Sequence, residues 1–171
     1  AKLCAFASVV LLPGWLLDLH VLGLGGHSMD DLATVIFSSG STGEPKGVML
    51  THENIAGNLE SVIQWAQFNP EDRLVGVLPF FHSFGYTVTL WGPLQVGASA
   101  VYHPDPRQAR EIGELCRKHA ATVYLTTATF LRFCPRKCEP DDFKTLRVVI
   151  CGAEKLPPSL ATEFAARFGV M

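Results

Sequence analysis

Short apolar segments alternate with helical patterns along this sequence, and this alternation limits the fold more than any other feature. Apolar runs predict strands at residues 74–78, 98–102, 123–125 and 146–151. Between them, apolar residues recur at helical spacing, and the pattern repeats at intervals of about 20 to 30 residues. Such alternation is typical of βαβ units. We therefore expect an α/β fold, with a mostly parallel sheet and helices on both faces.

Several helix ends are marked by the residues that usually occupy them. Thr51 is a good N-cap, and the helix after it carries apolar residues on one face as far as about Phe68. Asp105 and Pro106 predict the start of another helix, as its N-cap and its first residue. Further helices are expected at residues 85–95, 128–133 and 157–169.

A polar stretch at residues 38–47 follows one more apolar run, residues 33–37, which we expect to be a strand covered on both faces. The stretch consists of Ser38, Ser39, Gly40, Ser41, Thr42, Gly43, Glu44, Pro45, Lys46 and Gly47. Glycines let backbone N–H groups approach an anion closely, hydroxyls donate further hydrogen bonds, and the lysine adds a positive charge. The stretch therefore predicts a phosphate cradle. A flexible polar loop is the alternative, since glycine and serine also gather in loops without ligands.

Two common nucleotide motifs do not fit this cradle. A nucleotide-hydrolase loop needs a Gly-Lys-Ser/Thr ending that opens a helix, whereas Lys46 lies between Pro45 and Gly47 and is followed by apolar residues. The spacing of the glycines also differs from the dinucleotide fingerprint. The cradle, the segment at residues 79–86 and the segment at residues 152–157 all follow predicted strands. Because ligands of such sheets bind beyond the carboxyl ends of the strands, the three segments could converge on one crevice.

Composition narrows the class of protein. A chain of 171 residues with 48% hydrophobic residues can bury a core, and its net charge of −2 argues against nucleic-acid binding. The five cysteines are an odd number and mostly lie in or beside apolar segments, which favours reduced thiols in a cytoplasmic protein. Cys134 and Cys138 lack a second Cys or His pair at zinc-finger spacing, so we expect no metal site there.

The first 30 residues form an apolar lead-in. A signal peptide would need a clear cleavage site, and a membrane-spanning helix would have to carry Pro13, Gly14, Asp18 and His20 within it. We favour a buried or interfacial segment. We expect two parts, residues 1–30 as this lead-in and residues 31–171 as part of a larger domain, because the chain begins at Ala1 rather than at Met.

Three stretches in the right order resemble one family, the adenylate-forming enzymes. Residues 38–48 with Thr51 and His52 are similar to the phosphate motif of that family, and residues 79–85, Pro-Phe-Phe-His-Ser-Phe-Gly, are similar to its aromatic-plus-His motif. Residues 148–157 are similar to its strand and turn on the adenine side. The resemblance implies part of the large N-terminal domain of such an enzyme, covering residues 31–171.

The resemblance also implies a reaction. A carboxylate attacks the α-phosphorus of ATP in the presence of Mg²⁺, giving an acyl-adenylate and pyrophosphate, and a thiol then takes the acyl group. By this resemblance the cradle holds the β- and γ-phosphates, and His82 acts near the carboxylate. Gly152, Ala153 and Glu154 border the adenine and the acyl groove. His82 could instead be a packed core histidine, and Glu154 a solvated turn residue.

Within the family, residues 152–157 and 128–132 look most like the acyl-[acyl-carrier-protein] synthetases, which are often fused to a 2-acylglycerophosphoethanolamine acyltransferase. That branch implies a fatty acid as substrate and acyl carrier protein or coenzyme A as acceptor. It also allows membrane association of the parent protein, at the inner face of the membrane. The alternatives are an aryl or amino-acid adenylation domain and a non-catalytic nucleotide-binding module.

Later motifs of the family, such as Tyr-Gly-x-Thr-Glu, do not occur in this sequence. We therefore expect the fragment itself to be inactive. Truncation would leave apolar surface exposed, so we also expect it to self-associate.

Overall fold

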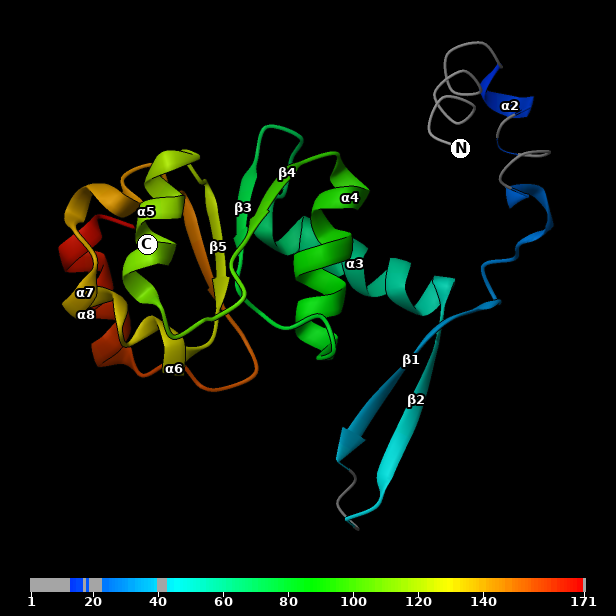
Figure 1. Ribbon diagram of the computed structural model, residues 1–171, viewed down its shortest axis with the longest axis horizontal. Helices are drawn as coiled ribbons and strands as arrows, with labels where there is room; N and C mark the ends of the chain where they lie inside the picture. Colours follow the sequence, from blue (N-terminus) through cyan, green and yellow to red (C-terminus); the bar gives the residue numbers. More distant parts are fainter. Residues whose placement is uncertain (1–12, 17, 19–22, 40–42, 171) are drawn as a thin grey trace.

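A four-stranded parallel sheet forms the centre of the computed structural model, which describes residues 13–16, 18, 23–39 and 43–170. The strands follow the spatial order β4-β3-β5-β6 (Figure 1). Their bounds are β3 Arg73–Gly76, β4 Ser99–Tyr102, β5 Val123–Thr126 and β6 Val148–Cys151. All four lie within the apolar runs or at their edges, and the expected α/β fold is confirmed.

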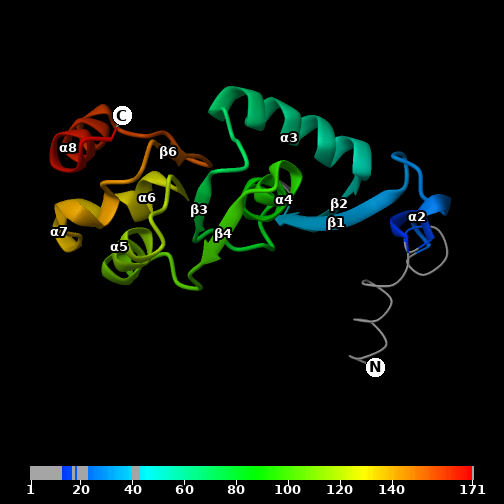
Figure 2. The same ribbon diagram turned by 90° about the horizontal axis from the view of Figure 1, so that it is seen from above.

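Helices cover both faces of this sheet, because successive strand residues point to opposite sides. Val75 and Tyr124 are register partners, and they pack on one face beneath four helices and a 3-10 turn: α5 Ala109–Lys118, α6 Ala128–Leu131, α7 Cys134–Lys137, η4 Pro140–Phe143 and α8 Pro158–Phe168. Leu74 and Val123 pack on the other face against α3 His52–Ala66, the π-helix η3 Gly85–Trp91 and α4 Gly92–Val96. Figure 2 shows α3 and α5 on opposite sides of the sheet.

The first of the two cores is rich in aromatic rings. Phe143 is fully buried, and its ring centroid lies 4.8 Å from that of Phe168 and 5.4 Å from that of Phe164. Tyr124 also stacks on Phe143, with 6.0 Å between the ring centroids. Three thiols, Cys116, Cys134 and Cys138, are free and buried in the same cluster. Burial raises the pKa of the Cys116 thiol far above its ordinary value, so this thiol is unreactive at neutral pH.

The strand expected at residues 33–37 does not join the parallel sheet, and this part of the sequence interpretation is wrong. It belongs to β1 Leu32–Ser39, which pairs with β2 Pro45–Thr51 in an antiparallel hairpin. The hairpin extends away from the parallel sheet (Figure 1). Its apolar side chains are not covered on both faces, since Phe37 is 72% exposed and Met49 is 67% exposed. A short apolar run predicts a strand but cannot say which sheet the strand joins.

Helix α3 begins as the sequence predicts. Thr51 is its N-cap, with the Thr51 hydroxyl accepting from the Asn54 N–H and the Asn54 side chain accepting from the Thr51 N–H. The expected start of α5 is wrong, because the helix begins at Ala109 with Gln108 at its N-cap position. Asp105 instead accepts from the backbone and guanidinium of Arg107, and this local turn ends before the helix.

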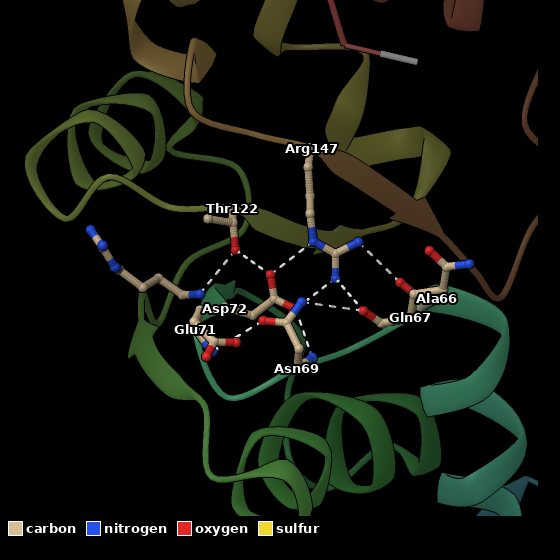
Figure 3. A network of polar contacts seen from close by, with 8 residues as sticks. Ala66, Gln67, Asn69, Glu71, Asp72, Thr122 and Arg147 are labelled. Carbon is tan, nitrogen blue, oxygen red and sulfur yellow. Dashed lines mark hydrogen bonds and ion pairs between the residues drawn. The ribbon is translucent and has the colours of Figure 1, made fainter.

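A polar network joins the amino ends of three strands (Figure 3). Asp72 is 4% exposed and accepts from Arg147 Nε at 2.8 Å, from Arg147 Nη2 at 2.6 Å and from Thr122 Oγ1 at 2.7 Å. The same guanidinium donates to the carbonyls of Ala66 and Gln67 at the end of α3. These residues flank β3, β5 and β6, so the network fixes the edge of the sheet opposite the carboxyl ends of the strands.

Only short pieces of the lead-in are described. They are α2 Gly14–Leu16, the 3-10 turn η2 Leu24–Gly26 and a turn at residues 28–31, in which the Ser28 N–H donates to Asp31. The rest of the expected apolar segment, with Cys4, lies outside the described residues. Within the described ranges, we find no helix that is both long enough and apolar enough to cross a membrane.

Candidate functional site

The His82 segment lies beyond the carboxyl end of β3, in a tight turn. The His82 N–H donates to the Pro79 carbonyl at 3.1 Å, and the His82 carbonyl accepts from Tyr86 at 2.9 Å. His82 Nδ1 accepts from the Phe84 N–H at 3.2 Å, which leaves the proton of the neutral ring on Nε2. The His82 side chain is exposed. The alternative of a packed core histidine is therefore wrong.

The Gly152 segment follows β6 at the same edge of the sheet. The Gly152 N–H donates to the Thr126 carbonyl at 3.1 Å, which continues the pairing of β5 and β6 by one residue. Ala153 has a φ of 64°, in the left-handed region that costs a residue with a Cβ about 1 kcal/mol or more. Strained conformations of this kind often mark functional turns.

Glu154 is exposed, yet its carboxylate is not free in solvent. Thr129 donates its backbone N–H to Glu154 Oε1 at 2.7 Å and its hydroxyl to Glu154 Oε2 at 2.9 Å. The Thr129 N–H holds the pKa of Glu154 below its ordinary value, and the hydroxyls of Thr127 and Thr129 act in the same direction. The nearby thiol of Cys151 has its pKa raised to about 11 by burial, with a further contribution from Glu154. Glu154 is thus a solvent-exposed turn residue, as one of the two sequence interpretations had it, and it also accepts two hydrogen bonds from Thr129.

Phe84 brings the His82 and Gly152 segments together. Its ring lies against the Gly152 backbone, so closely that a Cβ on Gly152 would come within 2.5 Å of Phe84 Cε1. Only glycine leaves room for this contact. The two segments thus meet at the carboxyl ends of β3 and β6, as the sequence interpretation anticipated.

The cradle lies apart from these two segments, at the tip of the β1–β2 hairpin. Ser38 pairs with Lys46 and Phe37 with Gly47, and Ser39 pairs with Pro45 through the backbone. Gly43 has a φ of 84°, and the side chains of Ser38, Glu44 and Lys46 are exposed. Gly40, Ser41 and Thr42 lie outside the described residues. Among the residues that are described, no hydrogen bond or ion pair engages the Lys46 ammonium, which is available to an anion.

A hollow of about 320 Å³ separates the base of the hairpin from the His82 segment. Apolar and polar side chains from β2, α3 and the start of η3 line it: Leu50, Asn54, Ile55, Asn58, Ser83, Phe84, Thr87 and Val88. Its volume lies at the lower end of the range of small-molecule sites. Phe84 lines this hollow and also contacts Gly152, so the hollow adjoins the place where the His82 and Gly152 segments meet. None of the described cradle residues lines it, so the expected convergence of all three segments on one crevice is not found among the described residues.

The sequence interpretation missed the residues that support this region. Thr126 and Thr129 hold the Gly152–Glu154 turn, Phe84 joins it to the His82 segment, and Asn58 lines the hollow. A signal for the threonines was available, because Thr126, Thr127 and Thr129 follow a predicted strand whose carboxyl end lies at the ligand edge of the sheet.

No compact metal centre accompanies the site within the described part of the chain. There, no group of three or more His, Cys, Asp or Glu side chains is placed to hold an ion. Mg²⁺ commonly keeps water and substrate phosphates as most of its ligands.

A parallel sheet with helices on both faces is an α/β architecture, whose ligands commonly bind beyond the carboxyl ends of the strands. The family model described as AMP-binding enzyme matches residues 25–171. The chain therefore belongs to the AMP-binding, or adenylate-forming, enzyme family, and its fold matches the N-terminal domain of those enzymes.

Individual relatives come from several branches of this family. A nonribosomal peptide synthetase, phqB, from Penicillium fellutanum is 32% identical over 84% of this chain and 6% of its own length. A long-chain-fatty-acid–CoA ligase from Bacillus subtilis is 30% identical over 78% of this chain and 24% of its own. The crystal structure of ATP-bound MatB from Rhodopseudomonas palustris superposes with a TM-score of 0.74 and 29% identity, over 84% of this chain and 28% of that one. The chain thus spans about a quarter or less of the length of these relatives.

Proposed function

We propose that the whole polypeptide carrying these residues is an ATP-dependent fatty-acid ligase, and that residues 31–171 are part of its AMP-binding domain. The observation that carries the proposal is the contact of Phe84 with Gly152, beside the hollow between the hairpin and η3. It brings the aromatic-plus-His segment and the predicted adenine-side turn to one edge of the sheet. The Bacillus subtilis relative, a long-chain-fatty-acid–CoA ligase, supports a fatty acid as the acid and coenzyme A as an acceptor.

In this proposal each segment has one task in the first half-reaction. The carboxylate of the acid attacks the α-phosphorus of ATP, the bond between the α-phosphorus and the α,β-bridging oxygen breaks, and pyrophosphate leaves with that oxygen. Ser38 and Lys46, with the rest of residues 38–47, bind the β- and γ-phosphates, where backbone N–H groups and a positive charge stabilise the leaving group. Mg²⁺, when bound to the triphosphate, supplies further charge neutralisation there.

The other residues of the site orient the acid and the adenosine. Because His82 Nδ1 accepts from the Phe84 N–H, the protonated Nε2 of the neutral ring can donate to a carboxylate oxygen. The apolar part of the acid enters the hollow beside Phe84 and Val88. The backbone of Gly152 and Ala153 borders the adenine. The second half-reaction transfers the acyl group to a thiol, of coenzyme A or of an acyl carrier protein, and releases AMP.

Pyrophosphate–ATP exchange on the whole polypeptide tests this proposal. We expect exchange with palmitate, and a loss of at least about tenfold in Lys46→Ala, because one charged hydrogen bond contributes about 1.5 to 3 kcal/mol. The matched control is Lys118→Ala, which removes an exposed lysine at the end of α5 and should leave exchange unchanged. Acyl transfer to coenzyme A and to an acyl carrier protein, assayed separately, identifies the acceptor. Absence of exchange with every acid tested would refute the ligase.

An aryl or amino-acid adenylation domain is the second candidate, and the relatives among peptide synthetases favour it. The hollow also contains amide and hydroxyl groups, from Asn54, Asn58, Ser83 and Thr87, which could bind a polar acid. Exchange with amino acids or benzoates but not with palmitate would select this candidate. ATP binding without exchange would instead select a non-catalytic nucleotide-binding module.

A further inference from the structure

The Glu154 carboxylate connects the turn after β6 to the first turn of α6, at Thr129, which is 25 residues away in the sequence. One oxygen accepts from the Thr129 N–H at 2.7 Å, and the other accepts from the Thr129 hydroxyl at 2.9 Å. Both oxygens of the carboxylate thus accept hydrogen bonds from a single residue in the first turn of α6. A carboxylate held in this way is poorly placed to bind a ligand through the same oxygens.

The turn between β6 and Glu154 is held at both ends and is tight in the middle. At one end the Gly152 N–H donates to Thr126, and at the other end Glu154 accepts from Thr129. Between them, Ala153 has its left-handed φ of 64°, and Gly152 lies against the ring of Phe84. Ala153 would leave this conformation if nothing held the turn, because the left-handed region is unfavourable for alanine.

The groups around Glu154 favour its charged form. Thr127 and Thr129 donate to it, and Arg132 at the end of α6 lies close enough to stabilise its charge. The thiol of Cys151 is neutral at pH 7, because burial raises its pKa to about 11. The connection between the turn after β6 and α6 is therefore present throughout the neutral pH range.

We infer that Glu154 is a positioning residue, which acts through Thr129 to hold the backbone of Gly152 and Ala153 in place at the crevice. This inference rests on the function proposed above, and it gives Glu154 a positioning role rather than a contact with the ligand. The carboxylate touches neither ATP nor the acid. It fixes a strained turn whose backbone faces the ligand. The Thr129 hydroxyl donates one of the two hydrogen bonds that hold the carboxylate.

The connection itself can be tested without any activity. In the 171-residue chain, the amide proton of Thr129 should shift with pH as Glu154 titrates, with a midpoint below the ordinary glutamate value of 4.5. The shift should disappear in Glu154→Gln, and it should remain in Glu163→Gln, which alters an exposed glutamate of α8. A Thr129 amide proton whose chemical shift does not follow the titration of Glu154 would overturn the inference.

The positioning role is tested by kinetics on the whole polypeptide, with wild type, Glu154→Gln, Thr129→Val and Thr129→Ser. We expect Glu154→Gln and Thr129→Val each to raise KM for ATP about three- to tenfold, the effect of one lost hydrogen bond, with kcat changed less than twofold. Thr129→Ser keeps both donors and should restore the wild-type KM. Glu163→Gln should match wild type.

The outcomes separate the inference from the proposed function. An active wild type with unchanged KM in both Glu154→Gln and Thr129→Val overturns the positioning role alone. A Thr129→Ser variant as weak as Thr129→Val also overturns it, since the hydroxyl would then not be the cause. A wild type without exchange refutes the proposed function, and the positioning role falls with it.

Discussion

Replacing Arg147 by methionine should destabilise the fold strongly while leaving the carboxyl ends of the strands intact. The guanidinium makes two hydrogen bonds to Asp72 and two to the carbonyls that end α3. Methionine keeps much of the length and apolar stem but none of the donors. The Asp72 carboxylate would remain 4% exposed, with only Thr122 and the Asn69 N–H to bind it.

The expected loss in the free energy of unfolding follows from the number and the environment of the hydrogen bonds that Arg147 makes. Removing one partner of a fully buried ion pair costs about 3 to 5 kcal/mol, because a buried charge is left uncompensated. The Arg147 side chain is 35% exposed, however, and solvent reduces its share of the interaction. We therefore expect a loss of about 2 to 3 kcal/mol in the free energy of unfolding. For a chain of this size, that lowers Tm by about 4 to 12 °C.

Urea unfolding at pH 7, followed by circular dichroism, measures this loss in the 171-residue chain. The matched control is Arg136→Met, which removes an exposed arginine of α7 and should change stability by less than about 0.5 kcal/mol. The double variant with Asp72→Asn should be less destabilised than the sum of the two single variants, because each removes the same interaction. Equal stabilities of Arg147→Met and wild type would refute the reasoning.

The same network predicts a dependence on pH. Burial raises the pKa of Asp72, but the hydrogen bonds from Arg147 and Thr122 outweigh it and hold the pKa below the ordinary value of 3.8. A carboxyl whose pKa is lower in the folded state stabilises the fold above its unfolded pKa. That contribution disappears as the pH falls below 3.8 towards the folded value. Asp72→Asn should therefore lose less stability than wild type between pH 4 and the acid end of the curve.

Three further changes have outcomes that follow from the geometry. Gly152→Ala should cost about 1 to 3 kcal/mol in urea unfolding, because the new Cβ meets the ring of Phe84, whereas Gly57→Ala in α3 meets no atom within 4 Å and should stabilise slightly. His82→Ala should lower pyrophosphate exchange at least about tenfold without changing Tm by more than a degree or two, since the side chain is exposed. A loss of exchange that is accompanied by a larger fall in Tm would contradict this. Sedimentation should reveal concentration-dependent self-association that Phe37→Ser reduces, because this ring is 72% exposed, and a monomer at every concentration would oppose that view.

Local patterns were sufficient for much of the fold. The apolar runs located the four parallel strands, and Thr51 and Gly169 lie where α3 begins and where α8 ends. These features depend on residues close in sequence, whose spacing and capping chemistry act over one or two turns. The meeting of the His82 and Gly152 segments was also predictable, because carboxyl ends of parallel strands share one edge.

The partners of residues in long-range contacts could not be predicted from the sequence. Nothing near Asp72 in the sequence indicates Arg147, 75 residues away, as its partner. The run at residues 33–37 has the composition of a buried strand, yet its pairing with β2 places it in an exposed hairpin. The helix does not start at Asp105 as expected, because Arg107 binds the aspartate in a local turn. In each case the observed structure depends on a tertiary contact or on a competing local hydrogen bond.

The Asp72–Arg147 network and the proposed ligand-binding segments lie at opposite ends of the strands, which has a consequence for protein engineering. The network binds the amino ends of the strands, whereas residues 127–129 and 152–154 follow the carboxyl ends of β5 and β6. Substitutions that alter these segments therefore leave the network's bonds in place. A library aimed at new acid substrates should vary these segments and keep Asp72, Thr122 and Arg147, so that each variant retains the stability needed to accept a destabilising change.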